Sequence, residues 1–354
     1  MTPPVLSISN LFKTFPGSRL PAVNDFSLEV EKGQIISLLG ESGCGKTTVL
    51  RMLAGFEVPD SGNIVLNGKQ VSSKSVFIEP EHRGVGFVFQ DYALFPHKTV
   101  EENISFGLFK QNKIEKRQRT SQIIDLCGLQ GLEKRYPHQL SGGQKQRVAL
   151  GRALAPEPTL ILFDEPFSNI DTLRKNQMRY DIEQIIRQSE STAIFVTHDT
   201  KDVLAIADSV VVLRQGISLQ KGKPDAVYLN PRNQYVAEFF GKTNLLKGNL
   251  QRAGFATNIG MIPLLSQPDT AQGEVVLSIR PEQLEICTRE SACFCGSIIH
   301  ESFFGEYKEL ILKVPQTEGG TAEITVYAPA STVIRDGVCH LRIKVGQQPK
   351  ILEE

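Results

Sequence analysis

Residues 40–48, GESGCGKTT, constrain the possible folds of this chain more than any other segment. They match G-x-x-x-x-G-K-[ST], the pattern of a phosphate-binding P-loop. The mostly apolar residues 34–39 before the loop predict a short buried strand, and residues 48–54 after it predict a helix that ends at Gly55. Because a P-loop joins a strand to a helix, these flanks make a chance match a poor explanation. The sequence therefore predicts an α/β domain built around this loop.

The residue types in the loop suit the binding of a phosphate chain. Glycines let the backbone wrap an anion without Cβ atoms in the way, and successive N–H groups then point at it. The following helix adds the positive end of its dipole. We expect Lys46 to reach the β- and γ-phosphates and the Thr47 hydroxyl to bind Mg²⁺. The predicted nucleotide-binding residues are Gly40, Glu41, Ser42, Gly43, Cys44, Gly45, Lys46, Thr47 and Thr48.

Two adjacent acids follow a second apolar strand. Residues 160–163 are apolar and lead directly into Asp164 and Glu165. Asp164 is predicted to hold Mg²⁺, directly or through water, and Glu165 to polarise the water that attacks ATP. Adjacent acids are also common in surface turns, but here they end a buried strand in a chain that already has a P-loop. That context favours the catalytic interpretation.

A third motif, LSGGQ, stands before a helix that extends to Leu154. Ser141 with Gln144 three residues later satisfies a capping box, so capping of the helix is one explanation. Capping does not require two consecutive glycines, whereas Ser-Gly-Gly at a helix N-terminus exposes N–H groups for a second anion. The predicted anion-binding residues are Ser141, Gly142, Gly143 and Gln144.

With these motifs in this order, the chain resembles the ATP-binding cassette (ABC) ATPases over roughly its first two thirds. The resemblance implies that Gln90 senses Mg²⁺ and that His198 contacts the γ-phosphate. It implies that Phe15 stacks on adenine, although a core phenylalanine would look the same locally. Asp171 completes the D-loop, in which Ile170 stands where leucine is usual. The implied catalytic residues are Glu165, His198, Lys46 and Gln90, and the implied Mg²⁺ ligands are Thr47, Gln90 and Asp164.

The resemblance also implies a fold and an assembly. Residues 1–242 are expected to form the ABC nucleotide-binding domain, with a helical subdomain at about 91–155. Residues 243–354 contain short strand-like segments separated by Gly and Pro, which predicts a small all-β, barrel-like domain. The resemblance implies that this domain is regulatory. Each ATP is expected between the P-loop of one subunit and residues 141–144 of the other, so the chain should form a homodimer with two ATP molecules.

Composition narrows the function classes. Lys+Arg and Asp+Glu both number 39, so the net charge is zero and no excess of positive charge favours nucleic acid. The N-terminal residues lack the pattern of a secretory signal, and the longest apolar runs are too short to span a bilayer. The leading hypothesis is the ATP-hydrolysing subunit of an importer, peripheral at the cytoplasmic face of the inner membrane. Its partners would be membrane permease subunits and, indirectly, a periplasmic or extracellular solute-binding protein.

The transported solute is predicted from short sequence motifs. Residues 136–139, 155–158, 165–168 and 280–283 resemble the ferric-ion importer ATPases most. The ATPases of sugar, sulfate and polyamine importers share many of these motifs, so these solutes are the alternatives to ferric iron. The rival function of another class is a soluble ABC ATPase that acts on nucleic acid or ribosomes, and a third is an interaction protein with a vestigial ATP site. We expect the permease to contact residues 90–136, especially 92–97.

Overall fold

The computed structural model of the chain describes residues 3–168, 172–252, 254–264, 273–317, 319–334 and 337–352. Two compact units divide the chain, Met1–Pro224 and Asp225–Glu354. The predicted domain boundary after residue 242 thus differs from the division between the units, which falls before two short helices rather than after them.

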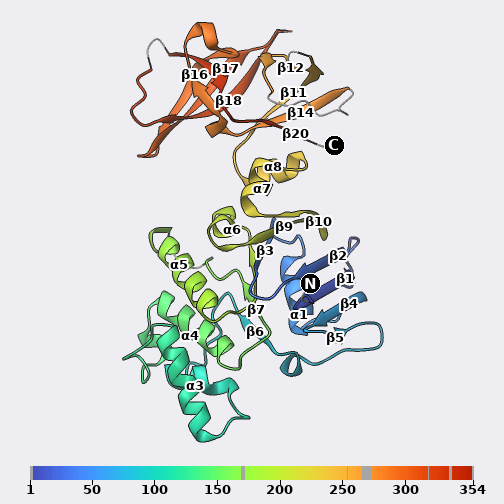
Figure 1. The fold of residues 1–354 in the computed structure, drawn as a ribbon, viewed down its shortest axis with the longest axis vertical. Coiled ribbons are helices and arrows are strands. Elements are labelled where there is room, and N and C mark those ends of the chain that lie inside the picture. Colours follow the sequence, from blue (N-terminus) through green and yellow to red (C-terminus); the bar gives the residue numbers. More distant parts are fainter. Residues whose placement is uncertain are drawn as a thin grey trace. The chain divides into compact units, whose positions relative to one another are not determined.

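A six-stranded sheet with the order β10-β9-β3-β8-β7-β6 carries the first unit (Figure 1). Strands β9, β3, β8, β7 and β6 run parallel, as predicted for the apolar runs near residues 160 and 193, and β10 runs antiparallel to β9. The bounds are β3 (Ile35–Leu39), β6 (Val85–Val88), β7 (Leu160–Asp164), β8 (Ala193–Thr197), β9 (Ser209–Arg214) and β10 (Ile217–Gly222).

Alternate residues of this sheet face two separate cores. On one face, Ile36, Leu162 and Val196 pack with α1 (Lys46–Ala54) and with an antiparallel sheet of order β2-β1-β4-β5. On the other face, Phe163 and Phe195 pack with helices. The antiparallel strands are β1 (Leu6–Lys13), β2 (Val23–Val30), β4 (Ser61–Leu66) and β5 (Lys69–Ser72). Burial on both faces explains why the parallel strands are continuously apolar.

Helices cover the second face (Figure 1). They are α2 (Val100–Ile104), α3 (Lys113–Leu126), α4 (Gly142–Leu154), α5 (Thr172–Gln188) and α6 (Thr200–Ile206). The predicted helical character between residues 99 and 136 is confirmed by α2 and α3. The 17-residue helix α5 was not predicted, because its charged sequence buries only a narrow stripe that includes Met178, Ile182 and Ile186. Such a stripe is a weak periodic signal.

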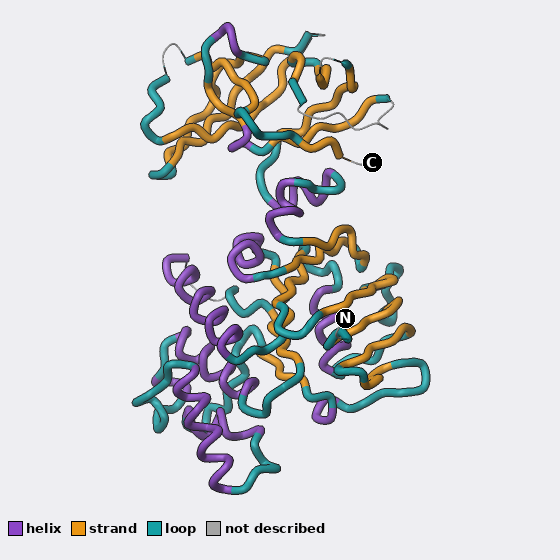
Figure 2. Tube along the Cα trace, viewed as in Figure 1, coloured by secondary structure: helices purple, strands orange, loops and turns teal. Residues whose placement is uncertain are grey.

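The second unit is rich in strands (Figure 2). After α7 (Pro224–Leu229) and α8 (Gln234–Phe240), two five-stranded antiparallel sheets share one apolar core and form a curled half-barrel. One sheet contains β13 (Gly260–Ile262), β12 (Gly254–Thr257), β11 (Asn244–Gln251), β14 (Glu274–Ile279) and β20 (Lys350–Leu352). The other contains β15 (Leu284–Ile286), β19 (Val338–Ile343), β16 (Phe294–Phe303), β17 (Tyr307–Pro315) and β18 (Thr321–Pro329). The predicted all-β C-terminal region is confirmed.

Arg280 explains why α7 and α8 belong to this second unit. Its buried guanidinium donates hydrogen bonds to the carbonyl of Tyr228 at the end of α7 and to those of Ala237, Gly241 and Lys242 around the end of α8. The Cζ atom also lies 4.1 Å from the centre of the Tyr228 ring. The last carbonyls of a helix have no partners inside it, so one arginine satisfies several and joins both helices to the strand region.

Candidate functional site

The P-loop connects β3 to α1 as the sequence predicts. Gly45 caps α1 with a φ of 105°, and a Cβ there would lie 2.1 Å from the Ala22 carbonyl oxygen. Both facts require glycine at this position. Within the loop, Glu41, Ser42 and Gly43 are exposed, whereas Cys44 is buried. The loop therefore offers one open side to solvent while its other side is held by the surrounding chain.

Lys46 lies across this loop. Its side chain is almost wholly buried, and its Nζ atom donates to the carbonyl oxygens of Gly40 at 2.8 Å and Glu41 at 2.7 Å. The amine is thus held at the loop by backbone acceptors from the loop itself. A cation in this place can meet a phosphate that the loop binds.

Thr47 and Asp164 meet although 117 residues separate them. The Thr47 hydroxyl on α1 donates to Asp164 Oδ1 at the end of β7, at 3.1 Å. Burial raises the pKa of Asp164, while the hydrogen bond from Thr47 opposes that shift and the adjacent Glu165 adds to it. A hydroxyl and a carboxylate are the hard oxygen donors that Mg²⁺ prefers, so the two residues fit the metal that the sequence implies.

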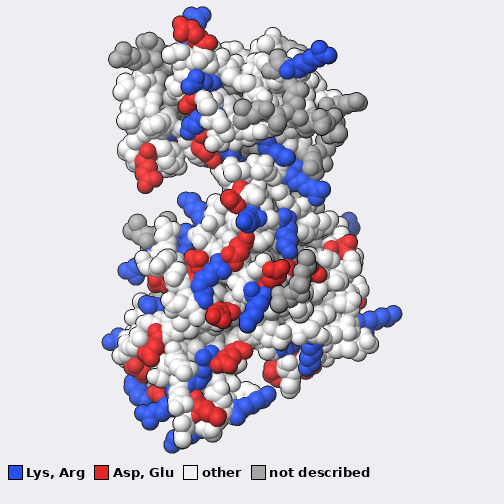
Figure 3. All heavy atoms as spheres, viewed as in Figure 1, with Lys and Arg blue, Asp and Glu red and all other residues white. Residues whose placement is uncertain are grey.

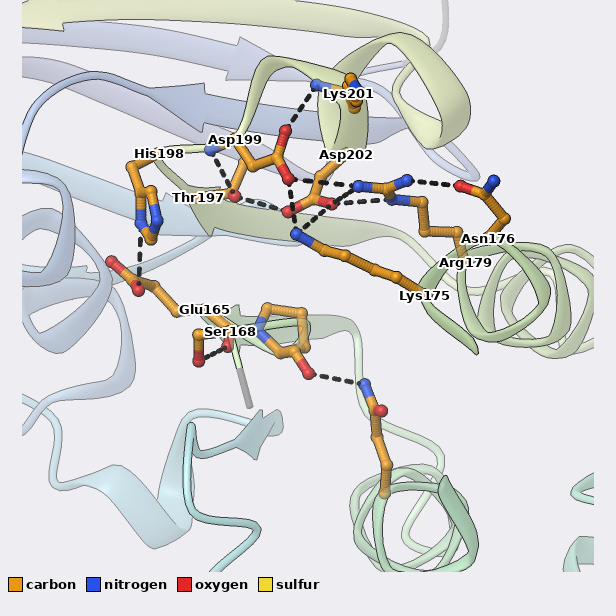
Figure 4. A network of polar contacts seen from close by, with 12 residues as sticks. Glu165, Ser168, Lys175, Asn176, Arg179, Thr197, His198, Asp199, Lys201 and Asp202 are labelled. Atoms are coloured by element: carbon orange, nitrogen blue, oxygen red, sulfur yellow. Dashed lines mark hydrogen bonds and ion pairs between the residues drawn. The ribbon is translucent and has the colours of Figure 1, made fainter. Parts of the chain in front are cut away.

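Glu165 and His198 form a second pair beside the first. Because β7 and β8 are parallel neighbours, their carboxyl ends bring Glu165 and His198 together, with Oε2 and Nδ1 3.2 Å apart (Figure 4). Glu165 has a φ of 45°, and its backbone N–H donates to the Val196 carbonyl at 3.0 Å. Left-handed backbone at a glutamate costs free energy and is typical of functional sites. The carboxylate and the imidazole are both accessible to solvent, at 24% and 58% exposure.

A buried cluster of charges lies behind His198, and the sequence analysis missed it. Lys175 and Arg179 of α5 contact the carboxylates of Asp199 and Asp202 at the start of α6 (Figure 4). The signal that could have found this cluster is the spacing. Two cations stand four residues apart on one helix, and two acids stand three residues apart directly after the predicted histidine.

Ser141 does cap a helix. It accepts a hydrogen bond from the Gln144 N–H at 3.3 Å and donates its own N–H to the Gln144 side chain at 2.9 Å, so the capping box before α4 is present. Ser141 and Gly142 are exposed, and α4 reaches the turn after Glu165 through a hydrogen bond of 2.9 Å from the Gln146 amide to the Pro166 carbonyl. Capping therefore accounts for Ser141 and Gln144 but not for the exposed Gly142, and anion binding by the motif stays a prediction.

Three predicted residues lie outside these pairs. Phe15 is 38% exposed, so it is not a core phenylalanine, and Lys13 Nζ lies 5.4 Å from the centre of its ring. Gln90 is exposed just after β6. Asp171 lies outside the described residues.

An apolar groove of about 610 Å³ lies beside the loop after β6. It is lined by aromatic rings, of which Phe106 and Phe109 are 51% and 74% exposed. Arg152 of α4 holds its wall by donating to the carbonyls of Tyr92 and Ala93. The predicted permease-contact residues 92–97 thus contribute Ala93 and Phe95 to the groove.

No helix among the described residues is long and apolar enough to cross a bilayer. On the face drawn in Figure 3, acidic and basic side chains are interspersed rather than gathered by sign. This distribution matches the zero net charge of the sequence.

Known proteins are similar to this chain over most of its length. The family described as "ABC transporter" matches residues 23–168. The putrescine transport ATP-binding protein PotG of Escherichia coli is 40% identical over 86% of this chain and 82% of its own length. The Fe(3+) ions import ATP-binding protein FbpC of Vibrio cholerae is 36% identical over 86% of this chain and 87% of its own. The sulfate/thiosulfate import ATP-binding protein CysA of Mesorhizobium japonicum is 41% identical over 82% and 84%.

Solved structures agree. The cbiO1 protein of Clostridium perfringens, part of an ABC transporter complex, matches 64% of this chain and 91% of its own with a TM-score of 0.59 and 27% identity. A dimeric ATP-binding cassette in a post-hydrolysis state, bound to ADP and Pi, matches 62% of this chain and 98% of its own with a TM-score of 0.54 and 26% identity.

Proposed function

The chain belongs to the ABC transporter family of ATP-binding proteins, and from this premise we propose that it is the ATP-hydrolysing subunit of an importer. The observation that carries the proposal is the meeting of the Thr47–Asp164 and Glu165–His198 pairs beside the P-loop. Together they provide two oxygen donors for a metal and an acid–imidazole pair open to solvent. A vestigial site would have no reason to keep both.

Each residue then has a role in phosphoryl transfer to water. Lys46 would bind the β- and γ-phosphates, and Thr47, Asp164 and Gln90 would hold Mg²⁺. When bound, the metal would neutralise charge on the phosphate oxygens. Glu165 orients the attacking water and accepts its proton. His198, whose Nδ1 lies 3.2 Å from Glu165 Oε2, would bind the γ-phosphate.

We propose that the working unit is a homodimer. Ser141 and Gly142 are exposed at the start of α4, whereas the P-loop belongs to the other core of the same unit. A second copy would bring its residues 141–144 to the nucleotide, and Asp171 is assigned to the same dimer contact. Phe15, exposed near the start of the chain, would stack on adenine.

The apolar groove is the proposed contact for the membrane permease. Exposed aromatic side chains around a concavity suit an apolar segment of a partner protein, and a patch of this kind rarely stays uncovered. The chain would then be peripheral at the cytoplasmic face of the inner membrane. A solute-binding protein outside that membrane would deliver the solute to the permease, and nucleic acid has no role.

Ferric iron is the proposed solute, with putrescine-like polyamines, sulfate and sugars as the alternatives. Relatives named for iron, putrescine and sulfate have 36%, 40% and 41% identity, so identity does not rank them. The iron proposal rests on the four short motifs that resemble the ferric-ion importer ATPases, at residues 136–139, 155–158, 165–168 and 280–283.

Deletion of the gene followed by uptake assays tests the proposal. Cells would be given radiolabelled ferric iron, spermidine, sulfate and maltose in parallel, and the expected result is loss of iron uptake alone. Complementation with Lys46→Ala should not restore uptake, whereas the unchanged gene should. Loss of another solute would replace iron and keep the importer, and unchanged uptake of all four together with co-purification of RNA or DNA would contradict the importer itself.

A further inference from the structure

We propose that Arg179 and Lys175 are positioning residues for His198, acting through the carboxylates of Asp199 and Asp202. The inference rests on the proposed role of His198 in ATP hydrolysis. It deepens that role by identifying what holds the imidazole beside Glu165.

The side chains on both sides of His198 in sequence are tied down. Thr197 Oγ1 donates to Asp202 Oδ2 at 2.7 Å and accepts from the Asp199 N–H at 3.0 Å. The Asp199 carboxylate accepts from the Lys201 N–H at 2.8 Å, which caps α6, and from Lys175 Nζ at 2.5 Å. His198 stands at the bend between β8 and α6, and its ring points toward Glu165 while Thr197 and Asp199 point toward α5 (Figure 4). Fixing residues 197 and 199 in these places therefore fixes the direction of His198.

Arg179 is the centre of the cluster. Its Nε and Nη2 atoms donate to Asp202 Oδ1 at 2.7 and 2.5 Å, and Nη2 also lies 3.2 Å from Asp199 Oδ2. The Arg179 and Asp202 side chains are only 7% and 6% exposed. Water cannot readily replace either partner at such burial, so the two carboxylates keep the positions that the guanidinium gives them.

The cluster balances its own charge, with two cations facing two carboxylates. Burial acts to raise the pKa of Asp199, but the hydrogen bonds from Lys175 and the Lys201 N–H, with the charges of Lys175 and Arg179, outweigh it and lower that pKa. Asp199 therefore stays ionised and attached to α5 at neutral pH.

The segment that contains His198 is thus connected to α5. Lys175 and Arg179 of this helix hold Asp199 and Asp202, whereas the Glu165 backbone is held separately by its N–H bond of 3.0 Å to the Val196 carbonyl. The consequence is that α5 sets the position of the imidazole relative to the carboxylate. A change at Arg179 should move the imidazole while the P-loop stays intact.

Ring signals of His198 in the full-length protein test this inference without depending on activity. The chain has six histidines, so with ¹³C-labelled histidine the His198 signal is the one that His198→Ala removes. We expect Arg179→Met to shift that signal and Arg179→Lys to restore it in part. The matched control is Arg187→Met, which removes another ion pair of α5, with Asp208 at 2.7 Å, and should leave the signal unchanged.

Turnover is the second measurement. Arg179→Met should lower the rate of ATP hydrolysis by about tenfold or more while the affinity for ATP is kept, because a small misplacement of a catalytic group costs rate rather than binding. If Arg179→Met does not fold, Lys175→Met, at a side chain that is 16% exposed, should shift the His198 signal in the same direction.

The outcomes separate the two claims. A His198 signal that is unchanged in the folded Arg179 or Lys175 variant would overturn the positioning role, even if the melting temperature falls. A wild-type protein that binds ATP but never hydrolyses it in the presence of its membrane partner would instead overturn the proposed function. The shift of the signal would still decide the positioning role.

Discussion

Arg179 in the first unit and Arg280 in the second are both almost completely buried, but their partners differ. Arg179 faces the carboxylates of Asp199 and Asp202, whereas Arg280 faces backbone carbonyls and the ring of Tyr228. Carboxylates are carried on side chains that can be repositioned next to a reactive group. Carbonyls at helix ends are fixed by the helix, so an arginine bound to them holds elements together. The comparison teaches that a buried arginine positions a site or joins elements according to its acceptors.

The largest effect is expected on ATP turnover, from a substitution of Glu165, which lies beside the Arg179 cluster and can be changed without disturbing the fold. Glu165→Gln should lower ATP turnover by about a thousandfold, since the amide cannot accept the proton of the attacking water. That factor corresponds to about 4 kcal/mol of activation free energy. ATP affinity and the melting temperature should be close to those of the wild type, measured by nucleotide titration and thermal unfolding. Near wild-type turnover would show that Glu165 is not the base.

Arg280→Met should have the opposite effect, because it should lower the stability of the fold and leave ATP binding unchanged. It leaves several buried carbonyls without donors, so the free energy of unfolding of the second unit should fall by about 3 kcal/mol. ATP binding by the first unit should be kept. Arg342→Met is the matched control, because its ion pair with Glu285 is 39% exposed on the arginine side and should contribute about 1 kcal/mol or less. Equal losses in denaturant unfolding of the two variants would refute the joining role of Arg280.

Ser141→Asp separates capping from anion binding within the first unit. Aspartate caps a helix as well as serine, so stability should be kept. Its charge would face the phosphates of the partner's ATP in the proposed dimer, and turnover should fall by about tenfold or more. Ser141→Asn, a neutral cap, controls for the change of side chain. If both variants hydrolyse ATP like the wild type, residue 141 only caps α4.

The smallest effect concerns the ring beneath Arg280. Burial, followed by the hydrogen bond of 2.5 Å to Glu282, raises the pKa of Tyr228 above the usual value for tyrosine. A phenol with a raised pKa stabilises the fold fully below about pH 10 and loses that contribution as pH rises further. Tyr228→Phe should cost about 1 kcal/mol at neutral pH. It should also flatten the alkaline loss of stability in unfolding curves recorded from pH 8 to 12, and an unchanged alkaline slope would contradict this assignment.

Much of the fold could be predicted because its signals are local. The strands near residues 35, 85, 160 and 193 are largely apolar runs. After residue 243, glycine and proline residues separate short segments, and this spacing indicates strands. Helix α5 could not be predicted from its narrow apolar stripe. The domain boundary was predicted after residue 242, whereas the two compact units divide after Pro224. Nothing in the sequence near α7 or α8 indicates that Arg280 will satisfy their last carbonyls.

The sequence by itself determined the P-loop, the two acids at the end of β7 and the helix-capping serine, because each depends on neighbouring residues and on backbone conformations that glycine or a buried strand imposes. Only the tertiary structure decided which of these side chains meet. Thr47 reaches Asp164, and Glu165 reaches His198, because the sheet order places β3, β8 and β7 side by side. Arg179 and Asp202 became partners through packing of α5 against α6, and Arg280 and Tyr228 through packing of α7 and α8 against the strand region. Such contacts form when side chains that are far apart in the sequence are buried together, and no short stretch of residues encodes which of them will meet.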